Sequence, residues 1–282
     1  MTDANADTSG GGWRAALRLG FSSFKERTIL DRRQHEGPLM VQRPFYPEPG
    51  GVCHVYMLHP PGGVVGGDRL RVEVDVGPDA HALVTTPAAG KFYRSAGAEA
   101  QQRQILNVSA DATLEWFPLE NIFYSGARVE TTTRIHLSTG SRFIGWDILC
   151  LGRPACGERF ENGRIDQRLE IWRGDTPLRI ERLCFAGNDP VLDARWGMAG
   201  YPVIASMVCV TPREDLADKL REIKTRPGGE EMISVTRLDG LVICRYLGRH
   251  VEHARQYFIA AWEILRLAVL RRKAVMPRIW ST

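Results

Sequence analysis

Residues 68–79 read DRLRVEVDVGPD, and this stretch decides the fold class. Every second position is apolar: Leu70, Val72, Val74 and Val76. The positions between them carry arginine, glutamate or aspartate. A period of two is typical of a β-strand with one buried and one solvated face, and Gly77-Pro78-Asp79 is a turn that ends it.

Strand patterns continue on the carboxyl side of this stretch. HALVTTP (81–87) is the next predicted strand, and ARVETTTRIHLSTG (127–140) again alternates, with Val129, Thr131, Thr133, Ile135 and Leu137 on one face. SRFIGWDILCLG (141–152) is apolar almost throughout, which predicts a strand covered on both faces. Residues 164–185 predict a hairpin around Arg173-Gly174-Asp175. Turns recur about every ten residues, as in an all-β sandwich, barrel or solenoid.

Two helices are predicted, both late in the chain. Thr211-Pro212-Arg213-Glu214 has the pattern of a capping box with proline in the first turn. A stripe of Leu216, Leu220 and Ile223 follows it, and Pro227-Gly228-Gly229 ends it. The second helix spans about 250–273, and one face carries Phe258, Ala261, Leu265 and Ala268. This face suits packing on the chain's own sheet or docking onto a helical partner.

Composition indicates one mainly-β domain over residues 13–282, preceded by a disordered tail at 1–12. The net charge of +4 does not favour nucleic-acid binding, and arginine far outnumbers lysine, which suits a protein contact surface as well as it suits codon bias. The start of the chain lacks a secretory signal, and no segment is long and apolar enough to cross a membrane. The six scattered cysteines are expected to be reduced. We therefore expect a soluble cytoplasmic protein.

HPPGGVVGGD (59–68) concentrates glycine and proline in ten residues. It is not a phosphate-binding loop, because Asp68 stands where such a loop requires a lysine, and a strand rather than a helix follows. His59 and Asp68 make either a weak divalent-metal site or a hydrogen-bonded turn. The glycines predict a tight loop that lies against another strand. No C-x-x-C or H-x-x-x-H spacing indicates a stable metal site.

Two further segments carry candidate functional residues. Lys91, Phe92, Tyr93 and Arg94 bring two cations and two aromatic rings together, which is typical either of a core with its rim or of an interface. Glu115 and Glu120 flank Trp116-Phe117-Pro118, and two carboxylates in aromatic surroundings are candidates for general acid and base. The alternative is that Glu115 is simply the outward residue of a strand.

Several long motifs, in this order, resemble the family of the urease accessory protein UreD, also called UreH. They are HPPGGVVGGDRL (59–70), TTPAAGKFYRS (85–95), LEWFPLENIFYSGA (114–127) and GWDILCLGRPACGERF (145–160). The segment 35–63, the late RYLG (245–248) and the terminal PRIWST (277–282) fit the same family. The resemblance covers about residues 13–282. Gly90 and Cys244 depart from the family pattern, and Cys244 puts a family role at that position in doubt.

The resemblance implies a mainly-β, helix-like stack of sheets with two helices. It also implies a non-enzymatic maturation factor that binds apo-urease and a UreF-like protein, which in turn recruits a UreG-like GTPase. The assembly delivers Ni²⁺ to urease, so this chain would hold nickel in transit and no tightly bound cofactor. Imidazole and carboxylate groups are ligands for Ni²⁺.

We expect some acids and one histidine of the matching motifs to line a nickel route: His59, Asp68, Glu120, Asp147 and Glu158. Each also has an ordinary structural explanation, such as pairing of Glu158 with Arg153 or Arg159. Lys91, Phe92, Tyr93 and Arg94 are the predicted partner contacts. The alternative functions are a carbohydrate-active enzyme on a β-solenoid that uses Glu115 and Glu120, and a binding module without a metal role.

Overall fold

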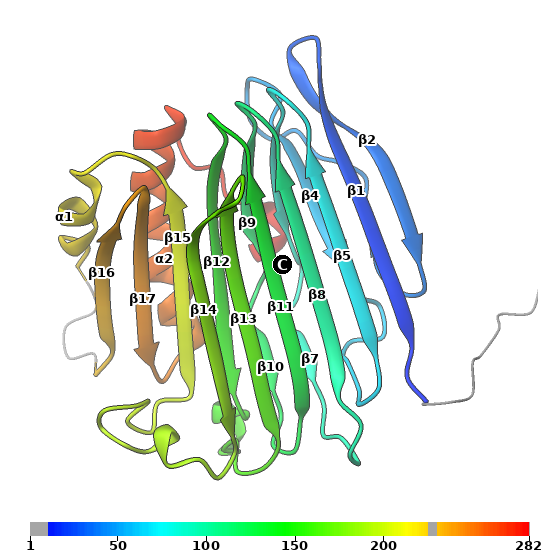
Figure 1. Ribbon diagram of the computed structural model, residues 1–282, viewed down its shortest axis with the longest axis vertical. Coiled ribbons are helices and arrows are strands. Elements are labelled where there is room, and N and C mark those ends of the chain that lie inside the picture. Colours follow the sequence, from blue (N-terminus) through cyan, green and yellow to red (C-terminus); the bar gives the residue numbers. More distant parts are fainter. Residues whose placement is uncertain (1–10, 225–229, 282) are drawn as a thin grey trace, which may run out of the picture.

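The structure, a computed structural model, describes residues 11–224 and 230–281. Two sheets lie face to face, and over residues 53–173 the chain passes repeatedly from one sheet to the other (Figure 1). The seven-stranded sheet contains β1 (Arg14–Phe24), β2 (Arg27–Glu36), β5 (Arg69–Val76), β8 (Ala100–Val108), β11 (Arg128–Leu137), β13 (Arg164–Arg173) and β14 (Thr176–Ala186). Its order is β14-β13-β11-β8-β5-β1-β2.

The ten-stranded sheet has the order β16-β17-β15-β12-β9-β6-β4-β3, and β10 and β7 extend it beside β12. Its members are β3 (Met40–Val41), β4 (Cys53–Leu58), β6 (His81–Thr85), β7 (Gly90–Phe92), β9 (Thr113–Phe117), β10 (Asn121–Phe123), β12 (Arg142–Leu151), β15 (Val203–Val210), β16 (Met232–Leu238) and β17 (Leu241–Gly248). In the middle of both sheets neighbouring strands are parallel. Each coil therefore supplies one strand to each sheet, which confirms the predicted stacked-sheet, β-helix-like fold.

The two strand patterns on which the prediction relied are confirmed. In β5 the four apolar residues are buried between the sheets and the charged residues between them face outward. β12 is buried on both faces because the seven-stranded sheet covers one side and the long helix covers the other. The predicted hairpin is β13–β14, which pair antiparallel. Four of the six cysteines are buried, Cys156 and Cys184 are exposed, and all six are free thiols.

The helices confirm the two predicted positions, with one correction. α1 (Leu216–Arg221) begins four residues later than the predicted first turn. The Thr211 hydroxyl accepts a hydrogen bond from the backbone N–H of Arg213 (3.2 Å), but Glu214 pairs with Arg237 instead of returning to the cap. The capping box is therefore not formed. The predicted stop at 227–229 lies outside the described residues.

The long helix α2 (Val251–Leu265) continues through one π-helical turn (Arg266–Leu270). Its predicted apolar face packs on β12, β15 and β17 of the ten-stranded sheet, opposite the side that faces the seven-stranded sheet (Figure 1). Packing on the chain's own sheet is thus what the structure shows for this face. The short 3-10 helices are η1 (Pro154–Cys156), η2 (Pro190–Leu192) and η4 (Arg278–Ser281).

A buried ionic cluster attaches the end of this helix to the sheet. Arg266 is 0% exposed and donates from Nε to Glu115 (3.0 Å) and from Nη2 to Glu48 (2.6 Å). His54 contacts Glu48 (2.8 Å), and His81 contacts Glu115 (2.7 Å). Burial alone would raise the pKa of Glu48, but His54 and Arg266 lower it to about 2. The charge of Arg266, which interrupts an otherwise apolar stretch of helix, is thus neutralised inside the protein.

Candidate functional site

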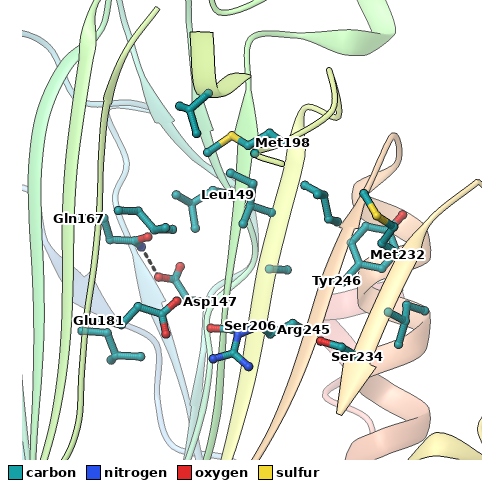
Figure 2. A pocket seen from close by; sticks show the side chains of 18 residues that line it. Asp147, Leu149, Gln167, Glu181, Met198, Ser206, Met232, Ser234, Arg245 and Tyr246 are labelled. Carbon is teal, nitrogen blue, oxygen red and sulfur yellow. Dashed lines mark hydrogen bonds between the residues drawn. The ribbon is translucent and has the colours of Figure 1, made fainter. Parts of the chain in front are cut away.

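Three cavities lie in a row between the two sheets, and we call this row the inter-sheet passage. The first, of about 380 Å³, adjoins the loop 59–64. The middle one is a constriction of about 30 Å³ between β8, β11 and β13 on one side and β9 and β12 on the other. The third, of about 450 Å³, lies between β13–β14 and β15–β17–β16 (Figure 2).

Neighbouring cavities share their walls. Gln102, Gln104 and Asn121 line both the first cavity and the constriction. Asp147, Gln167 and Ser206 line both the constriction and the third cavity. A volume of 30 Å³ corresponds to about one water molecule, so the middle cavity is much smaller than the two beside it.

The glycine-rich loop forms one wall of the first cavity. Val64 makes a parallel bridge to Phe92 of β7, and the predicted contact of this loop with another strand is confirmed. A Cβ atom on Gly63 would collide with the ring of Tyr93, so a larger residue there would have to displace that ring. The loop shapes the cavity through its backbone.

Asp68 holds this loop closed. Its carboxylate accepts hydrogen bonds from the backbone N–H groups of Trp13 (2.8 Å) and Val65 (2.9 Å), and the residue is buried. Asp68 does not line any of the three cavities that form the passage. Of the two sequence-based interpretations, the hydrogen-bonded turn accounts for its contacts in the described part of the chain.

Replacing Asp68 by alanine is expected to lower the free energy of unfolding by about 1–3 kcal/mol, because two backbone N–H groups lose their acceptor. Chemical denaturation of the variant measures this loss. Asp239, exposed in the turn between β16 and β17, is the matched control, and its alanine variant should change stability much less. An unchanged free energy for the Asp68 variant would contradict the capping role.

His59 and Asp147 are the two predicted route residues that line the passage. His59 lies in the first cavity and is half-buried. Burial lowers the pKa of its imidazole and Asp68 opposes this shift, so the neutral ring, which can bind a metal, is favoured. Asp147 projects from β12 and accepts a hydrogen bond from Gln167 of the opposite sheet (Figure 2). Burial raises the pKa of Asp147 to about 6.

Glu120 and Glu158 lie elsewhere. Neither lines any of the three cavities. Glu158 accepts a hydrogen bond from the backbone N–H of Ser125 (2.8 Å) and pairs with Arg153, which is one of the expected structural pairings. One carboxylate oxygen of Glu120 is buried and has no hydrogen-bond partner in the described part of the chain. The structure thus does not bring the five predicted residues together.

The predicted partner contacts divide in the same way. Phe92 is buried and stacks on Phe123 with ring centres 4.9 Å apart, so it belongs to the core. Lys91 and Tyr93 are partly exposed, and Arg94 is exposed. These three side chains stay predicted contacts, whereas Phe92 is accessible to a partner only through rearrangement.

Glu115 does not pair with Glu120 as a catalytic dyad would. Its side chain is 0% exposed and accepts hydrogen bonds from Trp262 (2.6 Å) and Arg266. Burial would raise the pKa of Glu115, but His81 and Arg266 outweigh it and hold the pKa below its usual range. An ionised carboxylate sealed behind a helix has no access to a sugar, so the position of Glu115 is structural.

The polar side chains that face inward between the sheets were not among the predicted site residues. Gln102 and Gln104 of β8 and Gln167 of β13 occupy positions where a sandwiched strand normally carries aliphatic residues. A signal was present in β11, where Thr131 and Thr133 share the predicted inward face with Val129. Polar residues at alternate positions of several neighbouring strands would have indicated a hydrated space between the sheets.

Within residues 11–224 and 230–281, no group of three or more histidine, cysteine, aspartate or glutamate side chains is arranged to hold a metal ion. In the same residues, no helix has both the length and the apolar composition that crossing a bilayer requires. The passage therefore supplies separate oxygen and nitrogen donors along a path, rather than a closed coordination shell.

Comparison with known proteins gives consistent matches over almost the whole chain. The family model described as UreD urease accessory protein matches residues 14–281. A urease accessory protein UreD of Dechloromonas aromatica is 47% identical, over 96% of this chain and 95% of its own length. Urease accessory protein UreD 2 of Brucella anthropi is 42% identical (96% and 99%), and UreD of Aliivibrio fischeri is 40% identical (98% and 99%).

Proposed function

The chain belongs to the UreD family of urease accessory proteins, and on this premise we propose that it is a scaffold that carries nickel to apo-urease. Members of this family are accessory proteins and not enzymes, and their role is in urease maturation. The finer proposal is that this chain binds apo-urease and a UreF-like protein in the cytoplasm. The UreF-like protein links it to a UreG-like GTPase. That GTPase supplies the nucleotide hydrolysis, because the sequence of this chain has no phosphate-binding loop.

The inter-sheet passage is the observation that carries the nickel proposal. A protein that only joined two partners would need a packed core, and apolar residues at the inward positions would provide it. Here glutamine, threonine and aspartate side chains interrupt the core along a row of cavities. Such a row offers oxygen ligands to a dication, so the ion would not be enclosed by apolar side chains alone.

The donors in the passage suit a cargo that must be released. His59 supplies an imidazole near one end and Asp147 a carboxylate near the other, and both are ligand types that Ni²⁺ accepts. Amide and hydroxyl oxygens of Gln104 and Thr133 lie between them at the constriction. Because the ligands follow one another singly, no position would hold the ion as tightly as a closed coordination shell.

Replacing His59 or Asp147 by alanine is expected to lower urease activation at limiting nickel by about tenfold, since losing one ligating contact typically weakens metal affinity by this factor or more. Because the pKa of Asp147 is about 6, its carboxylate is available above pH 6 and protons compete with nickel below it. The contribution of Asp147 should therefore fade as the pH drops through 6, and the Asp147→Asn variant should lack this dependence.

The measurement co-expresses each variant with apo-urease and a UreF-like protein and records co-purification, urease nickel content and activity. Glu158→Gln is the control, because Glu158 lies outside the passage and pairs with Arg153 at the surface. Full activation by both the His59 and the Asp147 variants at limiting nickel would contradict the route. Failure of the wild-type chain to co-purify with apo-urease, with or without the UreF-like protein, would contradict the scaffold.

A further inference from the structure

A row of hydrogen-bond donors crosses the wall of the third cavity. Ser206 of β15, Arg245 of β17 and Ser234 of β16 are directly paired in the antiparallel register, and all three line the cavity (Figure 2). Opposite residues in antiparallel strands have Cβ atoms roughly 4.5–5.5 Å apart. Two hydroxyl groups therefore flank one guanidinium group on a single wall.

These donors are underused within the described part of the chain. Arg245 donates from Nη1 to the hydroxyl of Thr236 (3.2 Å), and no carboxylate lies within ion-pair distance of it among the described residues. The hydroxyl groups of the half-buried Ser206 and the exposed Ser234 have no hydrogen-bond partner among those same residues. This row of side chains therefore presents hydrogen-bond donors to the cavity, and it contains no anionic group that neutralises the guanidinium of Arg245.

The charges near this row also favour the binding of an anion. Arg179 of β14 is buried and pairs with Glu181, which also lines the cavity. Burial lowers the pKa of Arg179 to about 10, and the positive charge of Arg245 contributes to this shift. Two guanidinium groups thus repel each other across this end of the passage, and Glu181 is taken up by one of them. Asp147 is turned toward Gln167 of the opposite sheet (Figure 2).

We propose that Ser206, Arg245 and Ser234 form a binding site for a small planar oxyanion of the carboxylate or bicarbonate type. The planar fork of a guanidinium group matches two oxygens of such an anion, and a hydroxyl on each side completes the contacts. The rest of the cavity wall is largely apolar, including Leu149 and Met198, and Ser234 lies at its exposed edge. The site is independent of nickel transit, since it requires no metal.

The test measures the melting temperature of the full chain as sodium acetate replaces sodium chloride at constant ionic strength, with no nickel present. A ligand that binds only the folded state raises the melting temperature by an amount that grows with the logarithm of its concentration relative to its Kd. We expect acetate to stabilise the wild-type chain and Arg245→Gln to weaken the apparent affinity at least about tenfold, because a charge-assisted hydrogen-bonded pair is lost. Ser206→Ala/Ser234→Ala should weaken it in the same direction.

Arg103→Gln is the matched control, because Arg103 is an exposed arginine on the outward face of β8 and loses the same charge. Its acetate response should equal that of the wild type. If Arg245→Gln does not fold, the double serine variant decides the outcome. An acetate response that survives in Arg245→Gln, or is lost equally in Arg103→Gln, overturns the site. Sulfate binding that depends on Arg245, without acetate binding, overturns the planar class of ligand.

Discussion

Replacing Arg266 by methionine is expected to lower the free energy of unfolding by about 3–5 kcal/mol, the range typical when one partner of a buried ion pair is removed. Methionine keeps much of the side-chain length, so the loss comes mainly from charge. Glu48 and Glu115 would remain buried without the cation that they share. Since α2 and its π-helical turn are attached to the sheet at this point, the change should also loosen the end of the chain.

The pH dependence of the free energy of unfolding tests the same prediction in a second way. The pKa of Glu48 in the folded wild type, about 2, lies below the ordinary value of 4.5. The carboxylate therefore stabilises the fold above pH 4.5, and this contribution is lost as the pH falls toward 2. In Arg266→Met the carboxylates lose the cation, so their pKa values rise. The stability difference between the two proteins should then shrink as the pH falls from neutrality toward 4.

Denaturant unfolding of the two proteins, from pH 4 to pH 8, makes this measurement. Arg159→Gln is the control, since Arg159 forms an exposed pair with Asp193 that should contribute less than about 1 kcal/mol. A loss below 1 kcal/mol for Arg266→Met at neutral pH would show that the cluster does not hold the helix.

The backbone of the fold could be predicted because its signal is local. The alternation in β5 and the continuous apolar run of β12 each fix how many faces of a strand are buried, and the structure agrees with both. Turns that recur about every ten residues fit a sandwich, a barrel or a solenoid alike, so the stacked-sheet arrangement was predicted only from the family resemblance. The start of α1 was wrong because Glu214 found a stronger partner in Arg237, which is distant in sequence.

The functional groups were harder to predict because their roles depend on long-range contacts. Glu115 and Arg266 are 151 positions apart. The residues that flank each of them in the sequence do not indicate that the two charges neutralise each other. Likewise, Asp68 and Asp147 are both acids in family motifs, yet one caps a turn and the other faces a cavity. Sequence spacing alone does not distinguish these two outcomes.

The second large effect is expected from Thr133→Trp. Thr133 projects from β11 into the constriction of about 30 Å³, where its hydroxyl hydrogen-bonds to Gln104 (2.9 Å). An indole ring is far larger than this space. We expect urease activation at limiting nickel to fall by at least about tenfold, which corresponds to about 1.4 kcal/mol of added barrier to passage. Overpacking should also cost the fold at least about 1–3 kcal/mol.

Thr132→Trp provides a closely matched control. Thr132 is the adjacent residue on the same strand, and its side chain points to the opposite, outward face because successive residues of a strand alternate. The two variants carry the same substitution one position apart. A difference in urease activation between them would therefore come from blocking the space between the sheets, and not from the mere presence of a tryptophan on β11.

The most direct test of the nickel route is the number of nickel ions per urease active site after co-expression with each variant at limiting nickel. The urease would be isolated from complexes that retain this chain and the UreF-like protein in equal amounts. We predict that urease matured with Thr132→Trp contains as much nickel as with the wild-type chain, and that urease matured with Thr133→Trp contains at least about tenfold less. Equal nickel content with both variants, in intact complexes, would contradict a route between the sheets.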